Sequence, residues 1–243
     1  MSMLVVGFLL LIVVPVLLSY LVAGAARSAH RMHWLSMDEE LSIEPETGYK
    51  TAQVLVARSG FHGMLSGVTE GSAYEADATA TCKRSDCDPP GLDCVCGFYS
   101  FKSRAEAERM LGQRIGYYGT RPTAFLTVEL DGSVLEYERG YRAERQNVVG
   151  VEILDGCDLC ERFGVSRDAT TLAASETFIP RRFSGMGRPT VHVPDGYLPV
   201  RPVCDDHVPN DETAIRLDSA ELGFLLNAKV TWRSPPDAKS PVA

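Results

Sequence analysis

Four residues of this sequence have the types and the spacing of a metal site. Cys157 and Cys160 form a Cys-x-x-Cys pair, and Cys204 and His207 form a Cys-x-x-His pair further along the chain. Each spacing lets two ligand atoms point at one ion, and thiolate and imidazole are the ligands of tetrahedral structural zinc sites. Because the protein would supply all four ligands, no position stays open for a substrate. The pattern predicts a Zn²⁺ ion that stabilises the fold.

A second group of cysteines lies earlier in the chain, at Cys82, Cys87, Cys94 and Cys96. The turn-forming run 88–91 (DPPG) folds the second pair back toward the first. In an extended Cys-x-Cys the two side chains would point to opposite faces, and Gly97 permits a turn that relieves this. We predict a second Zn²⁺ here, so that seven cysteines and one histidine supply eight ligands. Unmodified core cysteines and an iron–sulfur cluster are the alternatives.

Other chemistry is possible on the same residues. A zinc enzyme of the hydrolase or deaminase type would use Cys157, Cys160 and either Cys204 or His207 as three ligands, with water as the fourth and Glu161 as the nearby acid. A redox or iron-sensing module on Cys82–Cys96 is a further alternative. His62 and His192 are better explained as surface or hydrogen-bonded histidines, and Asp205 and Asp206 as caps of backbone amides. We therefore predict no catalytic residue and no enzyme.

The N-terminus carries a long apolar run, Leu4–Ala26, with no charged residue before it. Its 23 residues would span ~35 Å as a helix, enough to cross the ~30 Å hydrocarbon core of a membrane. The small residues 24–26 leave a cleaved signal peptide as the alternative. Arg27 and Arg31 follow the run, which by the positive-inside rule predicts a single-pass protein of the inner (plasma) membrane with its C-terminal domain in the cytoplasm.

Charge and cysteine number limit the partners. The net charge of −8 excludes sequence-independent nucleic-acid binding, which needs lysine and arginine to neutralise phosphates. The chain has seven cysteines, an odd number that would leave one thiol unpaired in a secreted, disulfide-bonded protein. A reducing cytoplasm keeps thiols free to bind metal. The sequence therefore predicts attachment to the membrane through Leu4–Ala26, a protein partner at the inner face of the membrane, and no nucleic acid.

Alternating apolar residues predict strands over 50–58, 64–68, 148–154 and 200–203. Ala124–Leu130 and Ser133–Tyr137 flank Asp131-Gly132, a two-residue pair typical of a hairpin turn. Capping-box spacing predicts helices near Ser36, from Ser103 to about Leu111, and around 222–229.

Two segments, Cys94-Val95-Cys96-Gly97-Phe98-Tyr99 and Gly140-Tyr141-Arg142-Ala143-Glu144, resemble patterns in uncharacterised actinobacterial and actinophage proteins. The resemblance covers about residues 50–150, and Cys157–His207 is similar to a zinc-ribbon addition. It implies a membrane-anchored cysteine-rich protein of actinobacterial or phage origin with no known activity.

The predicted fold class is α+β: a transmembrane helix followed by a small β-rich cytoplasmic domain with a zinc-ribbon-like element. The predicted divisions are 1–26 (anchor), 27–48 (juxtamembrane), 49–155 (β-rich domain with the first cysteine group), 156–233 (zinc-ribbon-like region with a C-terminal helix) and 234–243 (disordered tail). The predicted function is structural: a zinc-binding protein that presents a rigid surface to a protein partner.

Overall fold

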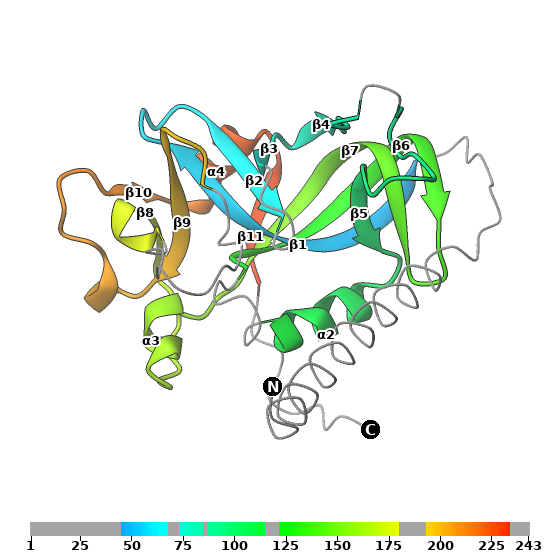
Figure 1. Ribbon diagram of the computed structural model, residues 1–243. Coiled ribbons are helices and arrows are strands. Elements are labelled where there is room, and N and C mark those ends of the chain that lie inside the picture. The colour runs from blue at the N-terminus through cyan, green and yellow to red at the C-terminus, as the bar shows by residue number, and fades with distance from the viewer. Residues whose placement is uncertain (1–44, 68–72, 85–86, 115–121, 180–192, 234–243) are drawn as a thin grey trace, which may run out of the picture.

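The computed structural model describes residues 45–67, 73–84, 87–114, 122–179 and 193–233 (Figure 1). Eleven strands join in one sheet. The strands are β1 (Glu46–Ala57), β2 (Gly63–Gly67), β3 (Ala73–Tyr74), β4 (Asp77–Thr79), β5 (Phe98–Phe101), β6 (Ala124–Glu136), β7 (Gly140–Ile153), β8 (Thr171–Ala174), β9 (Tyr197–Val203), β10 (Ile215–Leu217) and β11 (Lys229–Trp232). The helices are α2 (Arg104–Arg114), α3 (Asp158–Arg162) and α4 (Ser219–Leu226), with 3-10 turns η1 (Glu176–Phe178) and η2 (Asp205–His207).

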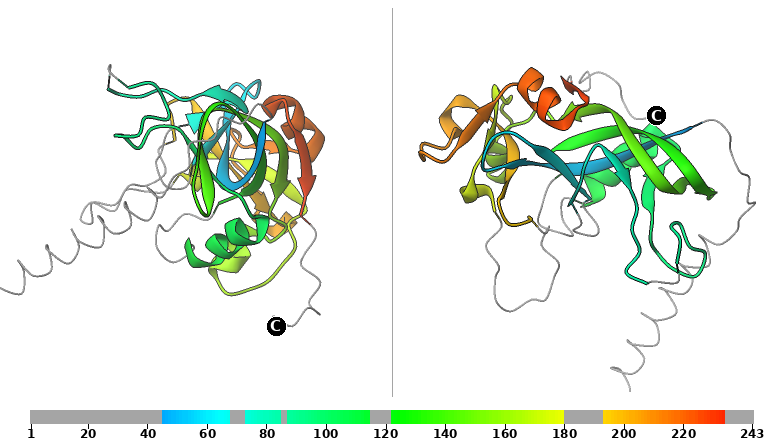
Figure 2. Two further views of the ribbon diagram at one scale, coloured as in Figure 1. Left: turned by 90° about the vertical axis from the view of Figure 1, so that its right-hand side faces the viewer. Right: turned by 90° about the horizontal axis from the view of Figure 1, so that it is seen from above.

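The long strand β1 pairs with four others. Its first half lies antiparallel to β6, and its last residues lie antiparallel to β9. The opposite edge pairs with β2 and, through Tyr49 and Phe101, with β5. Since β5 and β6 both pair with β7, the strands β1, β6, β7 and β5 form a closed circuit. Figure 2 shows the sheet curling around this circuit.

Strand periodicity places two apolar cores on opposite faces of the sheet. Successive side chains of a strand point to opposite faces; on β6, Ala124 and Leu126 therefore join the main core, whereas Phe125 packs against Ala107 of α2. Helix α4 packs against β2 and β11 and adds Leu222 and Leu226 to the main core. Helix α2 thus covers the outer face of the sheet, and the inner face is filled by side chains from the strands and from α4.

The predicted α+β class is wrong, because strands dominate the part of the chain that the structure describes. The three α-helices there have 11, 5 and 8 residues. The alternation that predicted separate short strands in fact continues through long ones, since β6 and β7 have 13 and 14 residues. The correct description is a mainly β fold.

The predicted hairpin turn at Asp131-Gly132 is also wrong, because both residues lie inside β6. Asp131 pairs with Arg145 and Val134 with Ala143, so one extra residue stands on β6. This is a β-bulge, and Gly132 supplies its positive φ of 74°. The true turn follows Glu136, where the Tyr137 amide donates to the Gly140 carbonyl at 2.8 Å.

Several predicted elements are confirmed with small shifts. Strand β1 begins at Glu46, and the strand predicted at 200–203 is the end of β9. Helix α4 carries the predicted capping box, since the Asp218 carboxylate accepts from the Glu221 amide at 2.8 Å. Helix α2 continues to Arg114, past the glycine expected to end it.

The predicted localisation needs correction. No helix in the described residues is long and apolar enough to span a membrane. The longest, α2, has 11 residues and so reaches only ~16 Å, half of the ~30 Å required. Leu4–Ala26, the helix expected near Ser36 and the tail 234–243 lie outside the described residues. The assignment as a single-pass membrane protein facing the cytoplasm is therefore withdrawn.

One lysine lies at the inner face of the curled sheet. Lys50 Nζ donates to Gln146 Oε1 at 2.8 Å and lies 4.7 Å from the centre of the Tyr74 ring and 5.4 Å from that of Phe98. No described carboxylate is paired with it. Burial lowers the pKa of Lys50 to about 7, because an ammonium ion loses hydration there.

We expect Lys50 to make stability depend on pH. Between about pH 7 and the ordinary lysine pKa of 10.5, the unfolded chain binds a proton that the folded chain lacks. The free energy of unfolding should therefore rise with pH in this range, by at most ~1.4 kcal/mol per unit. Lys50→Met should remove this slope in urea unfolding measured at several pH values. Lys229→Met, at an exposed lysine, should keep it; equal slopes in all three proteins would refute the assignment.

Candidate metal centres

The residues Cys157, Cys160, Cys204 and His207, here called the buried cluster, come from two similar turns. Cys157 precedes α3, and Cys160 lies within this helix; Cys204 precedes η2, and His207 ends that turn. In both pairs three residues of helical turn bring the two side chains to one side. The pairing of β8 with β9 brings the turns together, since Thr171 lies opposite Val203.

The distances within the buried cluster match a tetrahedral zinc site. The His207 Nδ1 atom lies 3.5, 3.3 and 3.4 Å from the sulfurs of Cys157, Cys160 and Cys204. The Cys160 and Cys204 sulfurs lie 3.7 Å apart. Zinc with bonds of ~2.3 Å to sulfur and ~2.0 Å to nitrogen requires ~3.8 Å between sulfurs and ~3.5 Å from sulfur to nitrogen. The four donor atoms therefore surround one point at the distances that this ion needs.

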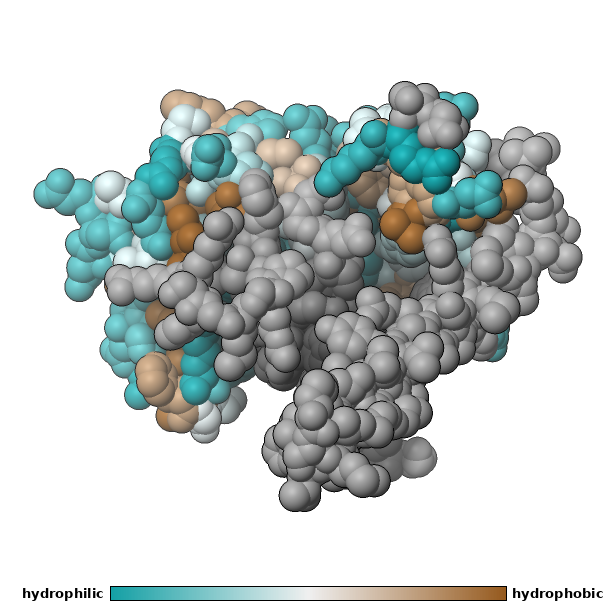
Figure 3. Space-filling view, in the orientation of Figure 1, coloured by the Kyte–Doolittle hydropathy of each residue, from teal (hydrophilic) through white to brown (hydrophobic). Residues whose placement is uncertain are grey.

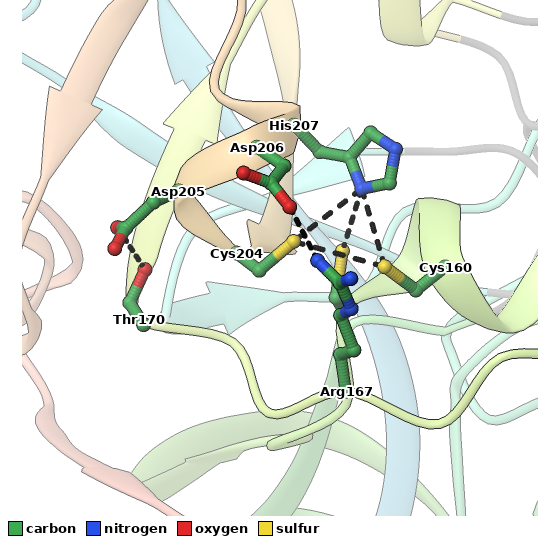
Figure 4. Close-up of polar contacts among 8 residues, drawn as sticks. Cys160, Arg167, Thr170, Cys204, Asp205, Asp206 and His207 are labelled. Carbon is green, nitrogen blue, oxygen red and sulfur yellow. Dashed lines mark hydrogen bonds and ion pairs between the residues drawn. The ribbon is translucent and has the colours of Figure 1, made fainter.

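Polar side chains hold the outer part of the histidine turn (Figure 4). Asp205 accepts a hydrogen bond from the Thr170 hydroxyl at 2.7 Å, and Asp206 pairs with Arg167. The pairing with Asp206 raises the pKa of Arg167. Asp205 and Asp206 were predicted to cap backbone amides; their bonds here run instead to side chains of the 167–170 segment. They join the two turns to each other.

A buried ion pair lies behind the buried cluster. Asp158, between the two cysteines, is 3% exposed, and Arg201 of β9 is 1% exposed. The Asp158 carboxylate lies 3.7 Å from Arg201 Nε and 2.9 Å from Arg162 Nη2. This ion pair ties α3 to the sheet. Breaking it would be costly, because it would leave a buried charge without this partner. The sequence held a signal for it, since an arginine is unexpected among the apolar residues of a strand.

The residues Cys82, Cys87, Cys94 and Cys96, here called the loop cluster, lie in the connection between β4 and β5. The ligand atoms of each cluster lie within 4.8 Å of one another. In the loop cluster the Cys94 sulfur is 3.6, 3.2 and 2.7 Å from those of Cys82, Cys87 and Cys96. Both clusters have the donors and the compactness to hold a metal ion.

Backbone amides support the sulfurs of the loop cluster. The amides of Arg84, Gly91 and Cys96 lie 3.4, 3.4 and 3.2 Å from a cysteine sulfur. Such donors stabilise thiolate charge. Gly91 has no room for a side chain, because a Cβ there would lie 2.5 Å from the Cys87 sulfur. Gly97 adopts a φ of +114°, which allows the turn that the Cys-x-Cys spacing needs.

Arg142 of β7 fixes this loop to the sheet. It is 3% exposed, and its guanidinium donates to the Gly91 carbonyl at 2.8 Å and to the Cys94 carbonyl. The centres of the Tyr99 and Tyr137 rings each lie 5.9 Å from the guanidinium carbon of Arg142. These contacts depend on the pairing of Tyr99 with Arg142 between β5 and β7, which the local sequence does not reveal.

The thiols of each cluster differ in acidity. In the loop cluster, hydrogen bonds from the Cys96 side chain and backbone lower the pKa of Cys94 to about 6, whereas the bonds to Cys94 and Cys96 raise the pKa of Cys87. In the buried cluster, burial raises the pKa of Cys157, but bonds from the Cys160 and Cys204 amides and His207 outweigh it and lower it to about 6. These contacts favour the thiolate, the form of cysteine that binds metal, at Cys94 in one cluster and at Cys157 in the other.

The other histidines are not metal donors in the described clusters. His62 Nδ1 lies 2.9 Å from the Tyr197 hydroxyl, as expected for a hydrogen-bonded histidine, and His192 lies outside the described residues. Glu161, the acid required by the enzyme alternative, has its carboxylate packed against Gly156.

No protein-family model, curated protein or solved structure matches this chain. The resemblance to actinobacterial and actinophage proteins stays a prediction.

We expect Arg142→Met to weaken metal binding at the loop cluster about 10- to 100-fold, the usual effect of losing a group that orients metal ligands. The change leaves the Gly91 and Cys94 carbonyls without their donor. Competition with a chromogenic chelator measures it. Arg145→Met is the matched control, because Arg145 lies on the same strand but is half-exposed and paired with Asp131 at 2.9 Å. The same affinity in both variants would contradict this role.

Proposed function

We propose that the chain is a β protein that two Zn²⁺ ions stabilise and whose metal-held loops bind a protein partner. The observation that carries the proposal is the geometry of the buried cluster, where three sulfurs and one imidazole nitrogen stand at tetrahedral zinc distances. Four protein donors complete the coordination shell of Zn²⁺. A structural ion explains this arrangement better than a catalytic one, which needs an open position for water.

Stability gives a reason for the metal. The binding free energy of a structural zinc adds directly to the free energy of folding. The buried cluster packs with a small core of its own, formed by Ala173, Phe178 and Val203. The loop cluster contributes no residue to the apolar cores of the described chain. Metal binding supplies what these two regions lack in apolar contacts.

The proposed interaction surface consists of apolar side chains beside the two metal sites. Leu92 and Val95 of the loop cluster are 54% and 59% exposed, and Phe163 and Val165, after α3, are 80% and 47% exposed. Figure 3 shows apolar atoms over the lower end of α3 and beside β5. Apolar side chains that gather in an exposed patch mark sites that bind proteins.

The metal content of the full chain, purified without added metal, tests the proposal. We expect two zinc ions per chain by elemental analysis, and all seven thiols protected from a thiol reagent until a chelator is added. His207→Ala should lower the content to about one zinc and lower the melting temperature. His62→Ala, the matched control outside both clusters, should keep two.

Coordination distinguishes the structural role from catalysis. Cobalt substituted into the protein should give the visible spectrum of tetrahedral thiolate sites, with no change on adding azide or cyanide, since no position is open. A spectrum that shifts with these anions would support the metalloenzyme. No bound metal with freely reactive thiols would refute the proposed function.

A further inference from the structure

The two clusters differ in their access to solvent. In the buried cluster the three cysteines are 0%, 4% and 6% exposed, and apolar side chains surround them. In the loop cluster all four cysteines are partly exposed. The residues next to them in sequence, Lys83, Asp88, Asp93 and Val95, are exposed. A small polar molecule dissolved in water can therefore reach the loop sulfurs and is excluded from the buried ones.

The sulfurs of the loop cluster are also placed to react with one another. The Cys94 sulfur is central, since it lies 2.7 Å from Cys96 and 3.2 Å from Cys87. The amide of Cys96 donates to this same sulfur at 3.2 Å, which favours its thiolate. In the buried cluster the Cys160 and Cys204 sulfurs are farther apart, at 3.7 Å. The His207 nitrogen lies near all three sulfurs there, at 3.3 to 3.5 Å.

We propose that the loop cluster is an oxidation-sensitive metal site that releases its ion when a peroxide oxidises Cys94, while the buried cluster keeps its ion. This inference rests on the proposed function, because it requires metal at both clusters. It assigns two roles to similar donor sets: the buried site holds the fold, and the loop site responds to the redox state of its surroundings.

The chemistry uses one molecule of hydrogen peroxide. The Cys94 thiolate attacks one peroxide oxygen; an S–O bond forms, the O–O bond breaks and hydroxide leaves. The thiolate of Cys96 or Cys87 then attacks the Cys94 sulfur; an S–S bond forms, the S–O bond breaks and a second hydroxide leaves. The two sulfurs together lose two electrons, which the peroxide oxygens gain. Zinc keeps its charge, loses two of its four thiolates and dissociates.

Release of the ion would change the proposed interaction surface. Leu92 lies between Cys87 and Cys94, and Val95 lies between Cys94 and Cys96, so the metal fixes their positions. Arg142 holds this loop through the Gly91 and Cys94 carbonyls, and a disulfide at Cys94 moves the second of these. Oxidation should therefore alter binding of the partner without unfolding the sheet.

Titration of the zinc-loaded full chain with hydrogen peroxide tests the inference. Zinc release is followed with a chromogenic chelator, and oxidised cysteines are mapped by differential alkylation and mass spectrometry. We expect about one zinc per chain to leave, with Cys94 in a disulfide and Cys157, Cys160 and Cys204 still reduced. Thiol reductant and added zinc should restore the second ion.

Three outcomes would overturn the inference: release of both ions together, oxidation of the buried cysteines first, or retention of both ions at peroxide levels that fully oxidise glutathione in a parallel sample. Zinc content measured before peroxide is added separates the two proposals. A loop cluster without metal at that stage refutes the proposed function, whereas a loaded cluster that resists peroxide refutes the redox role alone.

Discussion

The two-sided pairing of β1 is the constraint on which the rest of the structure depends. This strand lies between β6 and β9 on one edge and β5 and β2 on the other. Other strands pair with its backbone on both edges, and its residues Ala52, Val54 and Val56 are fully buried in the main core. Because β9 pairs with it, the turn that carries Cys204 and His207 is fixed relative to the main sheet.

Each candidate metal site lies where the sheet gives way to loops. The buried cluster joins the turn after β9 to the turn that opens α3, and the loop cluster spans the connection that leads into β5. In both, a buried arginine on a strand links the loop that carries the cluster to the sheet: Arg201 through Asp158 and Arg142 through two carbonyls. The strands thus fix the two arginines, and the contacts of these arginines hold the loops that carry the ligands in place.

The sequence predicted the members of both clusters because ligand type and spacing are local properties. Cys157 with Cys160, and Cys204 with His207, needed only one helical turn each to be recognised. The α4 capping box and β1 were predictable for the same reason. The identity of the metal and the partner stay outside what spacing can decide.

The errors arose where long-range pairing decides between local alternatives. Asp131-Gly132 carries the same signal whether it turns a hairpin or forms a bulge, and the pairing of β6 with β7 selected the bulge. Arg142 acquires its role only because β5 places Tyr99 opposite it. The α+β class failed because the alternation of β6 was divided at Asp131-Gly132 and only the end of β7, residues 148–154, was predicted as a strand.

The order of the strands has a consequence for synthesis of the chain on the ribosome. The four ligands of the loop cluster emerge close together, and β1, β5, β6 and β7 can pair once Ile153 has emerged. The parallel strand β11, which pairs with β7, and β9, which completes β1, emerge much later. A nascent chain therefore holds open edges on β1 and β7 until β9 and β11 have emerged, and exposed edges of this kind are where chains aggregate. Slow synthesis of the last third of the chain would therefore prolong the exposure of these two edges.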